Sequence, residues 1–226
     1  MRLLGDHGTL DWDETGILRM RYDGTGFDEL TSTLCTRLGE RAIPVEALQS
    51  IELDADVLRL VLREGADPLQ SVTGAPFDIL GTFKVDDPVA AERVRRDIRR
   101  TMARRDVPST PATRWLVAPP VAPDRIEGRD ATLSVAGGRL TFAYQRGARR
   151  KKKALGDPWA VPLDEIVDVE WSAGERRRKG FLRVSTARTP AERPKPSHDP
   201  AAMVSARGTD ADVLFFAARL LTRIRP

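Results

Sequence analysis

The stretch Ala42–Glu52, with the sequence AIPVEALQSIE, occurs a second time in altered form at Ala160–Glu170, where it reads AVPLDEIVDVE. In both copies a β-branched residue precedes a proline, an apolar residue and a carboxylate follow it, and a glutamate ends the segment. A segment that recurs in one chain indicates a duplicated structural unit. The sequence therefore predicts one fold built twice.

The length and composition are those of a globular protein. The 226 residues are enough for one large or two small domains. The chain has no run of about 18 apolar residues, so we expect no membrane-spanning helix, and its first residues lack the apolar core of a signal peptide. Cys35 is the single cysteine, which excludes an internal disulfide and a cysteine-rich zinc site. We expect a soluble protein of the cytoplasm.

Alternation of apolar and polar residues predicts strands in the first half, at 10–12, 18–22, 51–53 and 58–62, with a further short strand at 83–85. Pro44 cannot donate to a ladder, so its strand lies at a sheet edge or ends there. Residues 23–41 are open to two interpretations. Leucines four residues apart favour a short helix, whereas a Thr-rich stretch favours a strand.

The second half shows the same order. Strands are predicted at 133–135 and 140–144 around Gly137-Gly138, and then at 166–171, where Val167, Val169 and Trp171 alternate with acids. Further short strands follow at 182–184 and 203–205. Asp199-Pro200 corresponds to Asp67-Pro68 of the first half.

An amphipathic helix ends each half. Asp87-Pro88 is a typical helix start, and the expected apolar stripe is Ala90, Val94, Ile98 and Met102. Thr209 with Asp212 predicts a capping box at the start of the last helix. The stripe expected there consists of Val213, Phe216, Ala217, Leu220, Leu221 and Ile224.

These patterns predict an α+β, mainly β protein. It consists of two tandem bent antiparallel sheets or barrels, each capped by a C-terminal helix. The expected domains are residues 1–106 and 125–226, joined by a proline-rich linker at 107–124. Within that linker, Trp115-Leu116-Val117 is apolar, and we expect it to dock on one of the domains.

The charge of the chain is unevenly distributed. Residues 1–122 hold 16 basic and 20 acidic side chains, whereas residues 123–226 hold 21 and 13, so the net charge of +4 hides a positive second half. Two loops after the strands at 139–144 and 166–171 carry ten of these cations, and we expect both loops at one end of the sheet. The candidate anion-binding or lipid-binding residues are Arg146, Arg149, Arg150, Lys151, Lys152, Lys153, Arg176, Arg177, Arg178 and Lys179. The positive electrostatic field of these cations would attract an anionic bilayer or an acidic protein. The alternative interpretation is that the loops are only solvated and bind nothing.

No residue pattern in the chain indicates catalysis. His198 precedes Asp199-Pro200 without a second metal ligand nearby, which favours a turn. Cys35 has no neighbouring histidine, so we interpret it as a packed thiol. The basic loops contain no aromatic side chain for base stacking, which makes nucleic acid an unfavoured partner. We predict no cofactor and no catalytic residue. An enzyme with an unrecognised site stays an alternative, because a fold does not define an activity.

The doubled order of motifs resembles the bacterial domain-of-unknown-function 4429 family. The resemblance rests on the stretches Leu38–Val45, Leu58–Leu60, Ala66–Leu69, Trp115–Val117 with Pro119-Pro120, Phe181–Val184 and His198–Pro200. It implies two pleckstrin-homology-like (PH-like) domains, each a bent seven-stranded sheet capped by a C-terminal helix. That family has no established activity to carry over. We therefore expect a non-enzymatic binding or scaffolding protein with an unknown protein partner. The alternative is a peripheral module at the inner face of the membrane that binds anionic phospholipid through loops 146–153 and 176–179.

Overall fold

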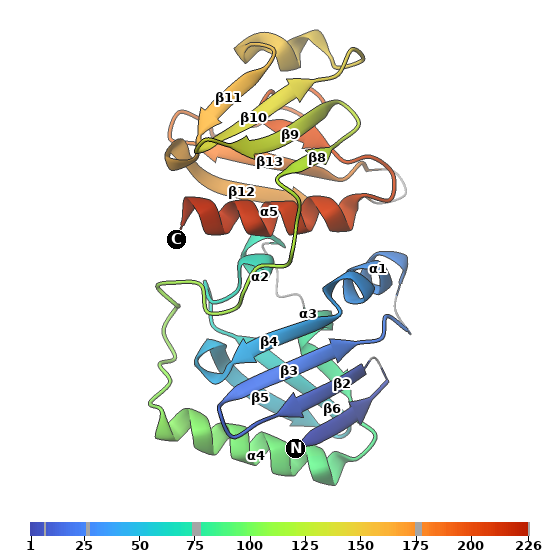
Figure 1. The fold of residues 1–226 in the computed structure, drawn as a ribbon, viewed down its shortest axis with the longest axis vertical. Helices are drawn as coiled ribbons and strands as arrows, with labels where there is room; N and C mark the ends of the chain where they lie inside the picture. Colours follow the sequence, from blue (N-terminus) through green and yellow to red (C-terminus); the bar gives the residue numbers. More distant parts are fainter. Residues whose placement is uncertain (7, 26–27, 74–77, 175–177, 226) are drawn as a thin grey trace. The chain divides into compact units, whose positions relative to one another are not determined.

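The computed structural model describes residues 1–226 except 7, 26–27, 74–77, 175–177 and 226 (Figure 1). The chain divides into two compact units. The first consists of Met1–Ser71 and Ala75–Ala118, and the second consists of Val72–Gly74 and Pro119–Pro226. Within the predicted linker, the amides of Leu116 and Val117 both donate to the carbonyl of Ala66, and Val117 is buried. This apolar segment is therefore bound to the first unit.

The first unit contains two antiparallel sheets. One has the order β1 (Arg2–Gly5), β2 (Gly8–Trp12), β3 (Ile17–Tyr22) and β4 (Glu40–Pro44), and the other has the order β5 (Leu48–Asp54), β6 (Val57–Leu62) and β7 (Thr82–Lys84). The helices are α1 (Glu29–Leu38), the short α2 (Pro68–Thr73) and α3 (Asp78–Gly81), and α4 (Pro88–Arg104). Helix α4 packs on β5 (Figure 1).

The second unit repeats this arrangement. Its first sheet has the order β11 (Trp159–Pro162), β10 (Arg139–Tyr144), β9 (Ala131–Ala136) and β8 (Arg125–Glu127), and its second sheet has the order β12 (Ile166–Ser172), β13 (Phe181–Thr186) and β14 (Ala202–Val204). Helix α5 (Asp210–Ile224) lies along β12 (Figure 1). The predicted mainly β fold with a terminal helix in each half is confirmed, and the sheets are open and not closed into barrels.

The recurring Pro-containing stretch forms the same structure in both units. Pro44 and Pro162 end edge strands, and a single 3₁₀ turn follows each of them, η1 (Val45–Ala47) and η3 (Leu163–Glu165). The next strand then starts with a β-bulge in each unit, between Leu48 and Ser50 and between Ile166 and Asp168. The prolines stop pairing because they lack an amide proton, so the repeat in sequence encodes a sharp corner between two sheets.

The structure decides one open alternative and corrects a predicted strand. Residues 29–38 are helical, because Asp28 accepts hydrogen bonds from the amides of Leu30 and Thr31 and so caps α1. The predicted burial of Val167 is wrong, since its side chain is 47% exposed. The bulge between Ile166 and Asp168 inserts one residue, and this moves Val167 out of the alternation.

Two predictions about the terminal helices are wrong in detail. Helix α4 buries Ala91, Val94, Ile98 and Thr101 in place of the predicted Ala90 and Met102. A strict spacing of four residues turns about 40° further round the helix at each step, so it leaves the buried face within three steps. Thr209 is the N-cap residue of α5, as predicted, but its side chain makes no capping hydrogen bond, because its hydroxyl donates to the carbonyl of Ala206.

The turn between β9 and β10 gives a first testable prediction. Gly137 and Gly138 have φ angles of 56° and 72°, and no atom lies within 4 Å of a Cβ added at either position. The Gly138→Ala substitution should therefore lower the free energy of unfolding by about 1 kcal/mol through backbone strain alone. Gly147 is equally open but has no positive φ, so Gly147→Ala should leave the free energy of unfolding unchanged or raise it slightly. Equal urea midpoints for the two variants would contradict this explanation.

Candidate functional site

A groove of about 610 Å³ lies beside the edge strand β11 of the second unit. Strand β11 forms one wall, and the loop between β13 and β14 forms the other. The lining is mainly apolar, with Leu155, Trp159, Pro162, Pro190, Pro194 and Pro200. Charged side chains from both walls line it as well, namely Arg139, Glu165, Arg188, Arg193 and Asp199. An apolar groove with a few polar groups is a typical binding site for a small molecule or a peptide.

The backbone of β11 offers hydrogen-bonding groups to this groove. Leu163 donates its amide to the carbonyl of Gly138, and β10 pairs with β11 in antiparallel register. Because pairing groups alternate along an antiparallel strand, Trp159 and Val161 face β10, whereas the N–H and C=O of Ala160 point away from it. The Arg139 guanidinium donates to the Ala160 carbonyl at 3.0 Å. The Ala160 amide is thus the donor that the edge presents to a ligand.

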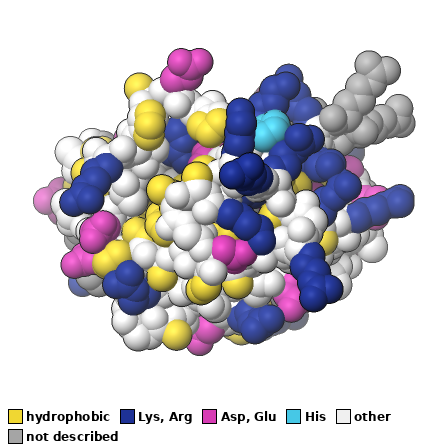
Figure 2. All heavy atoms as spheres, turned by 90° about the horizontal axis from the view of Figure 1, so that it is seen from above, with side chains coloured by type: hydrophobic (Ala, Val, Ile, Leu, Met, Phe, Trp, Pro, Cys, Tyr) yellow, Lys and Arg dark blue, Asp and Glu magenta, His cyan; other side chains and the backbone are white. Residues whose placement is uncertain are grey.

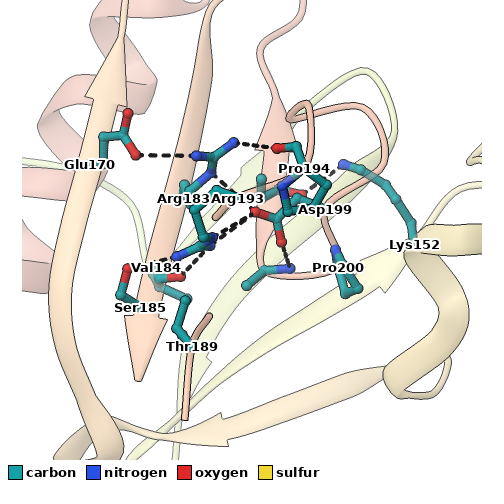
Figure 3. A network of polar contacts seen from close by, with 12 residues as sticks. Lys152, Glu170, Arg183, Val184, Ser185, Thr189, Arg193, Pro194, Asp199 and Pro200 are labelled. Carbon is teal, nitrogen blue, oxygen red and sulfur yellow. Dashed lines mark hydrogen bonds and ion pairs between the residues drawn. The ribbon is translucent and has the colours of Figure 1, made fainter. Parts of the chain in front are cut away.

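A buried carboxylate holds the second wall in place (Figure 3). Asp199 is 3% exposed, and its Oδ2 lies 2.9 Å from Arg193 Nη2 and 3.1 Å from Arg183 Nε. Its Oδ1 accepts from the Ala201 amide at 2.9 Å. Arg193 also donates to the carbonyl of Val184, which ties the loop to β13. The groove wall is therefore pre-formed by charge-assisted hydrogen bonds.

The first unit contains the same device. Asp67, which corresponds to Asp199 in the repeat, is 2% exposed, and its Oδ2 lies 2.8 Å from Arg41 Nη2. Its Oδ1 accepts from the Leu69 amide, two residues along the chain, as Asp199 accepts from Ala201. The partner arginine differs, because Arg41 lies on β4 whereas Arg183 lies on β13. The buried aspartate is thus common to both units, and the arginine that pairs with it is not.

Lys152 is not a surface cation, in contrast to its place among the predicted anion-binding residues. It lies in the 3₁₀ turn η2 (Arg150–Leu155) and is 0% exposed. Its Nζ lies 2.5 Å from Asp130 Oδ2 and donates to the Ala202 carbonyl at 2.7 Å. Burial is the largest influence on the Lys152 ammonium and lowers its pKa, while the hydrogen bond and the charge of Asp130 raise that pKa. Lys152 therefore joins η2 to the start of β14 and is unavailable to an external anion.

Around this anchor lies a cluster, the basic surface, defined as the exposed cations Arg149, Lys151 and Lys195 together with the half-buried His198. Figure 2 shows Lys and Arg side chains gathered around a histidine, and His198 is the one histidine that the structure describes. Partial burial lowers the pKa of His198, and the charges of Arg149, Lys151, Lys195 and Lys152 lower it further. Lys195 and His198 were absent from the sequence-predicted set, because they follow a different strand and only the fold brings them to η2.

The other predicted basic residues lie in several environments. Arg146 and Arg150 are exposed, whereas Lys153 lies 2.6 Å from Asp157 Oδ2 in an ion pair. In the second loop, Arg178 and Lys179 are exposed, and Arg176 and Arg177 lie outside the described residues. The expectation that both loops form one basic end therefore stays a prediction.

Two further expectations concern reactive groups. Cys35 is fully buried, and burial, followed by the charges of Asp23 and Asp28, raises the pKa of its thiol to about 11. At neutral pH this thiol is protonated and a poor nucleophile. Among the described residues, no three His, Cys, Asp or Glu side chains lie close enough to hold a metal ion. No helix in the described part of the chain is both long and apolar enough to cross a bilayer.

The two duplicated units, each with seven short strands among its described residues, arranged in two open sheets with a terminal helix, define a tandem-repeat class of mainly β protein. A family model described as "Domain of unknown function (DUF4429)" matches residues 15–95, which lie mainly in the first unit, and residues 133–221 in the second unit. These regions cover more than half of the chain, so the protein belongs to this family. No curated protein and no solved structure matches the chain.

Proposed function

We propose that this chain is a non-catalytic intracellular binding protein with two PH-like units, and that the second unit binds an extended segment of a partner protein. The groove beside β11 is the observation that carries this proposal. An extended peptide can pair with an exposed sheet edge while its side chains occupy neighbouring apolar pockets. The Ala160 amide supplies such an edge, and Trp159 with the groove prolines supplies apolar surface.

The geometry also limits how the ligand can bind. Strand β11 has four residues and ends at Pro162, so the edge supports one or two backbone hydrogen bonds. Short edge strands of this kind prevent uncontrolled pairing between copies. Most of the affinity must then come from apolar contacts in the groove. Arg188 and Glu165 are exposed on opposite walls, and neither forms an ion pair with another described residue, so each can select for charge along the ligand.

The test uses peptides selected from a random displayed library on the full chain. Ala160→Pro removes the outward amide without removing a hydrogen bond to β10, and we expect it to weaken the selected peptides about tenfold. Ala42→Pro is the matched control, because Ala42 precedes Pro44 by the same two residues and has the same outward register on β4. Fluorescence polarisation measures both affinities, and thermal unfolding by circular dichroism checks that each variant is folded.

Two results would contradict the proposal. The first is a selection that yields no binding peptide. The second is a set of peptides whose affinity falls equally with Ala160→Pro and Ala42→Pro, or with neither of them. In the expected case, the amide of Ala160 also becomes protected from hydrogen exchange when a peptide is bound.

A further inference from the structure

The basic surface carries positive charge that no described carboxylate neutralises. Arg149, Lys151 and Lys195 are exposed, and no ion pair joins them to a carboxylate in the described part of the chain. The next two lysines in sequence differ, because Lys152 is paired with Asp130 and Lys153 with Asp157. Unpaired cations held close together repel one another, so they are costly unless an external anion is present.

The anchor of Lys152 makes this arrangement rigid. Its ammonium group joins η2 to Asp130 and to the Ala202 carbonyl, which follows the loop that carries Lys195 and His198. Tyr144 reinforces the junction, because its hydroxyl donates to the Pro200 carbonyl at 2.7 Å. Contacts between residues 50 and 56 positions apart in sequence thereby hold two segments together. The cations keep their spacing without a bound ligand.

An apolar side chain lies in the same 3₁₀ segment as Lys151, and Arg149 is the N-cap residue of that segment. Leu155 ends η2 and is 55% exposed, four residues after Lys151. An exposed leucine beside lysine and arginine is the combination that interfacial membrane segments use, with the apolar group in the acyl boundary and the cations at the headgroups. Neither a free anion nor a nucleic acid gains from that leucine, and the basic surface contains no Phe, Tyr or Trp side chain on which bases could stack.

We propose that the basic surface, together with Leu155, docks the second unit on an anionic lipid bilayer. Leu155 also lines the groove, so the two proposals share that side chain, but peptide binding uses the Ala160 edge whereas lipid docking uses the cations. Each basic residue near such a bilayer increases the partition coefficient about fivefold at moderate salt. The binding is therefore expected to be reversible and to weaken when salt screens the charges.

Vesicle sedimentation tests this proposal with the full chain. The wild-type protein should pellet with vesicles of phosphatidylglycerol and phosphatidylcholine, and not with phosphatidylcholine alone. Arg149→Gln with Lys151→Gln should lower the partition coefficient about 25-fold. The matched control is Arg93→Gln with Arg100→Gln, which removes the same charge from exposed positions on α4 and should change it much less. Leu155→Ser should lower it without altering the net charge.

Further arms separate the other sources of negative charge. Inorganic phosphate at matched ionic strength should not displace the protein from vesicles, and polyglutamate should not bind in place of them. Equal pelleting with neutral vesicles, equal losses for the two double variants, or binding to polyglutamate alone would overturn the proposal. Ala160→Pro should leave vesicle binding unchanged, so the lipid and peptide proposals fail independently.

His198 makes this docking sensitive to pH. The charges that lower its pKa are those of Arg149, Lys151, Lys195 and Lys152, while Asp199, the next residue, is paired with Arg183 and Arg193. An anionic bilayer opposes that positive field and raises the pKa of His198, so binding takes up protons and strengthens as the pH falls. The partition coefficient on anionic vesicles should rise between pH 7.5 and pH 5.5, and His198→Gln should remove part of that rise. An unchanged rise in that variant would exclude His198 as its source.

Discussion

The Lys152→Met substitution is expected to lower the free energy of unfolding by about 3 kcal/mol, because it leaves the Asp130 carboxylate without its partner. The Lys152 ammonium is 0% exposed and lies 2.5 Å from Asp130 Oδ2. The Ala202 carbonyl also loses a donor. The Asp130 side chain keeps 13% exposure, so water can reach it, and the loss should lie at the lower end of the range for buried pairs. Urea unfolding monitored by circular dichroism measures the change.

The adjacent lysine is a matched control for this prediction. Lys153 is paired with Asp157 at 2.6 Å, but both side chains are 34% exposed. Lys153→Met should therefore cost at most about 0.5 kcal/mol. Adding Asp130→Asn to Lys152→Met removes the unpaired charge and keeps an oxygen for the Val204 amide, so it should restore part of the stability. Similar losses for the two lysine variants would show that Lys152 is not an anchor.

The Asp199→Ala substitution should lower the free energy of unfolding by about 3–5 kcal/mol, since two guanidinium groups lose one buried carboxylate. The side chains of Arg183 and Arg193 are only 10% and 15% exposed, so water cannot replace that carboxylate fully. The Ala201 amide loses its acceptor as well. Because Asp199 lines the groove, the same variant should also weaken the selected peptides.

The first unit provides the matching experiment. Asp67→Ala leaves the buried Arg41 unpaired and should cause a loss of similar size, but without an effect on the peptides that bind the second unit. Glu170→Ala is the surface control, because Glu170 is 50% exposed and lies 3.5 Å from Arg183. Glu170→Ala should lower the free energy of unfolding by less than about 1 kcal/mol. If Asp199→Ala and Glu170→Ala destabilise the chain equally, the buried carboxylate does not hold this loop.

Several elements could be predicted from the residues alone because their cause is local. Strands such as 18–22 bury alternate residues, and Pro44 and Pro162 end strands because they have no amide proton. Strands β1 and β8 were not predicted, since each buries a single apolar residue, Leu3 or Ile126, and one residue makes no alternation. The β-bulge at Val167 cannot be predicted from neighbouring residues either, because it arises only when β12 pairs with β13.

The candidate site was only partly predictable. The sequence shows a basic run at 149–153, but a run of charges does not say which member is buried. Lys152 and Lys153 are the same residue type in adjacent positions, and they differ only because Asp130 and Ala202 meet the first of them. The groove was not predicted, since its walls come from β11 and from a loop about 30 residues further along.

The order of residues by itself determined the duplication, the mainly β fold and the helix that ends each unit. Periodicity, proline and capping act between near neighbours, so they can be followed along the chain. Only the tertiary structure decided which charges are buried and which face solvent. Burial depends on segments that are distant in sequence, as when Lys152 meets Ala202, and the cost of an unpaired charge arises only after those segments have excluded water.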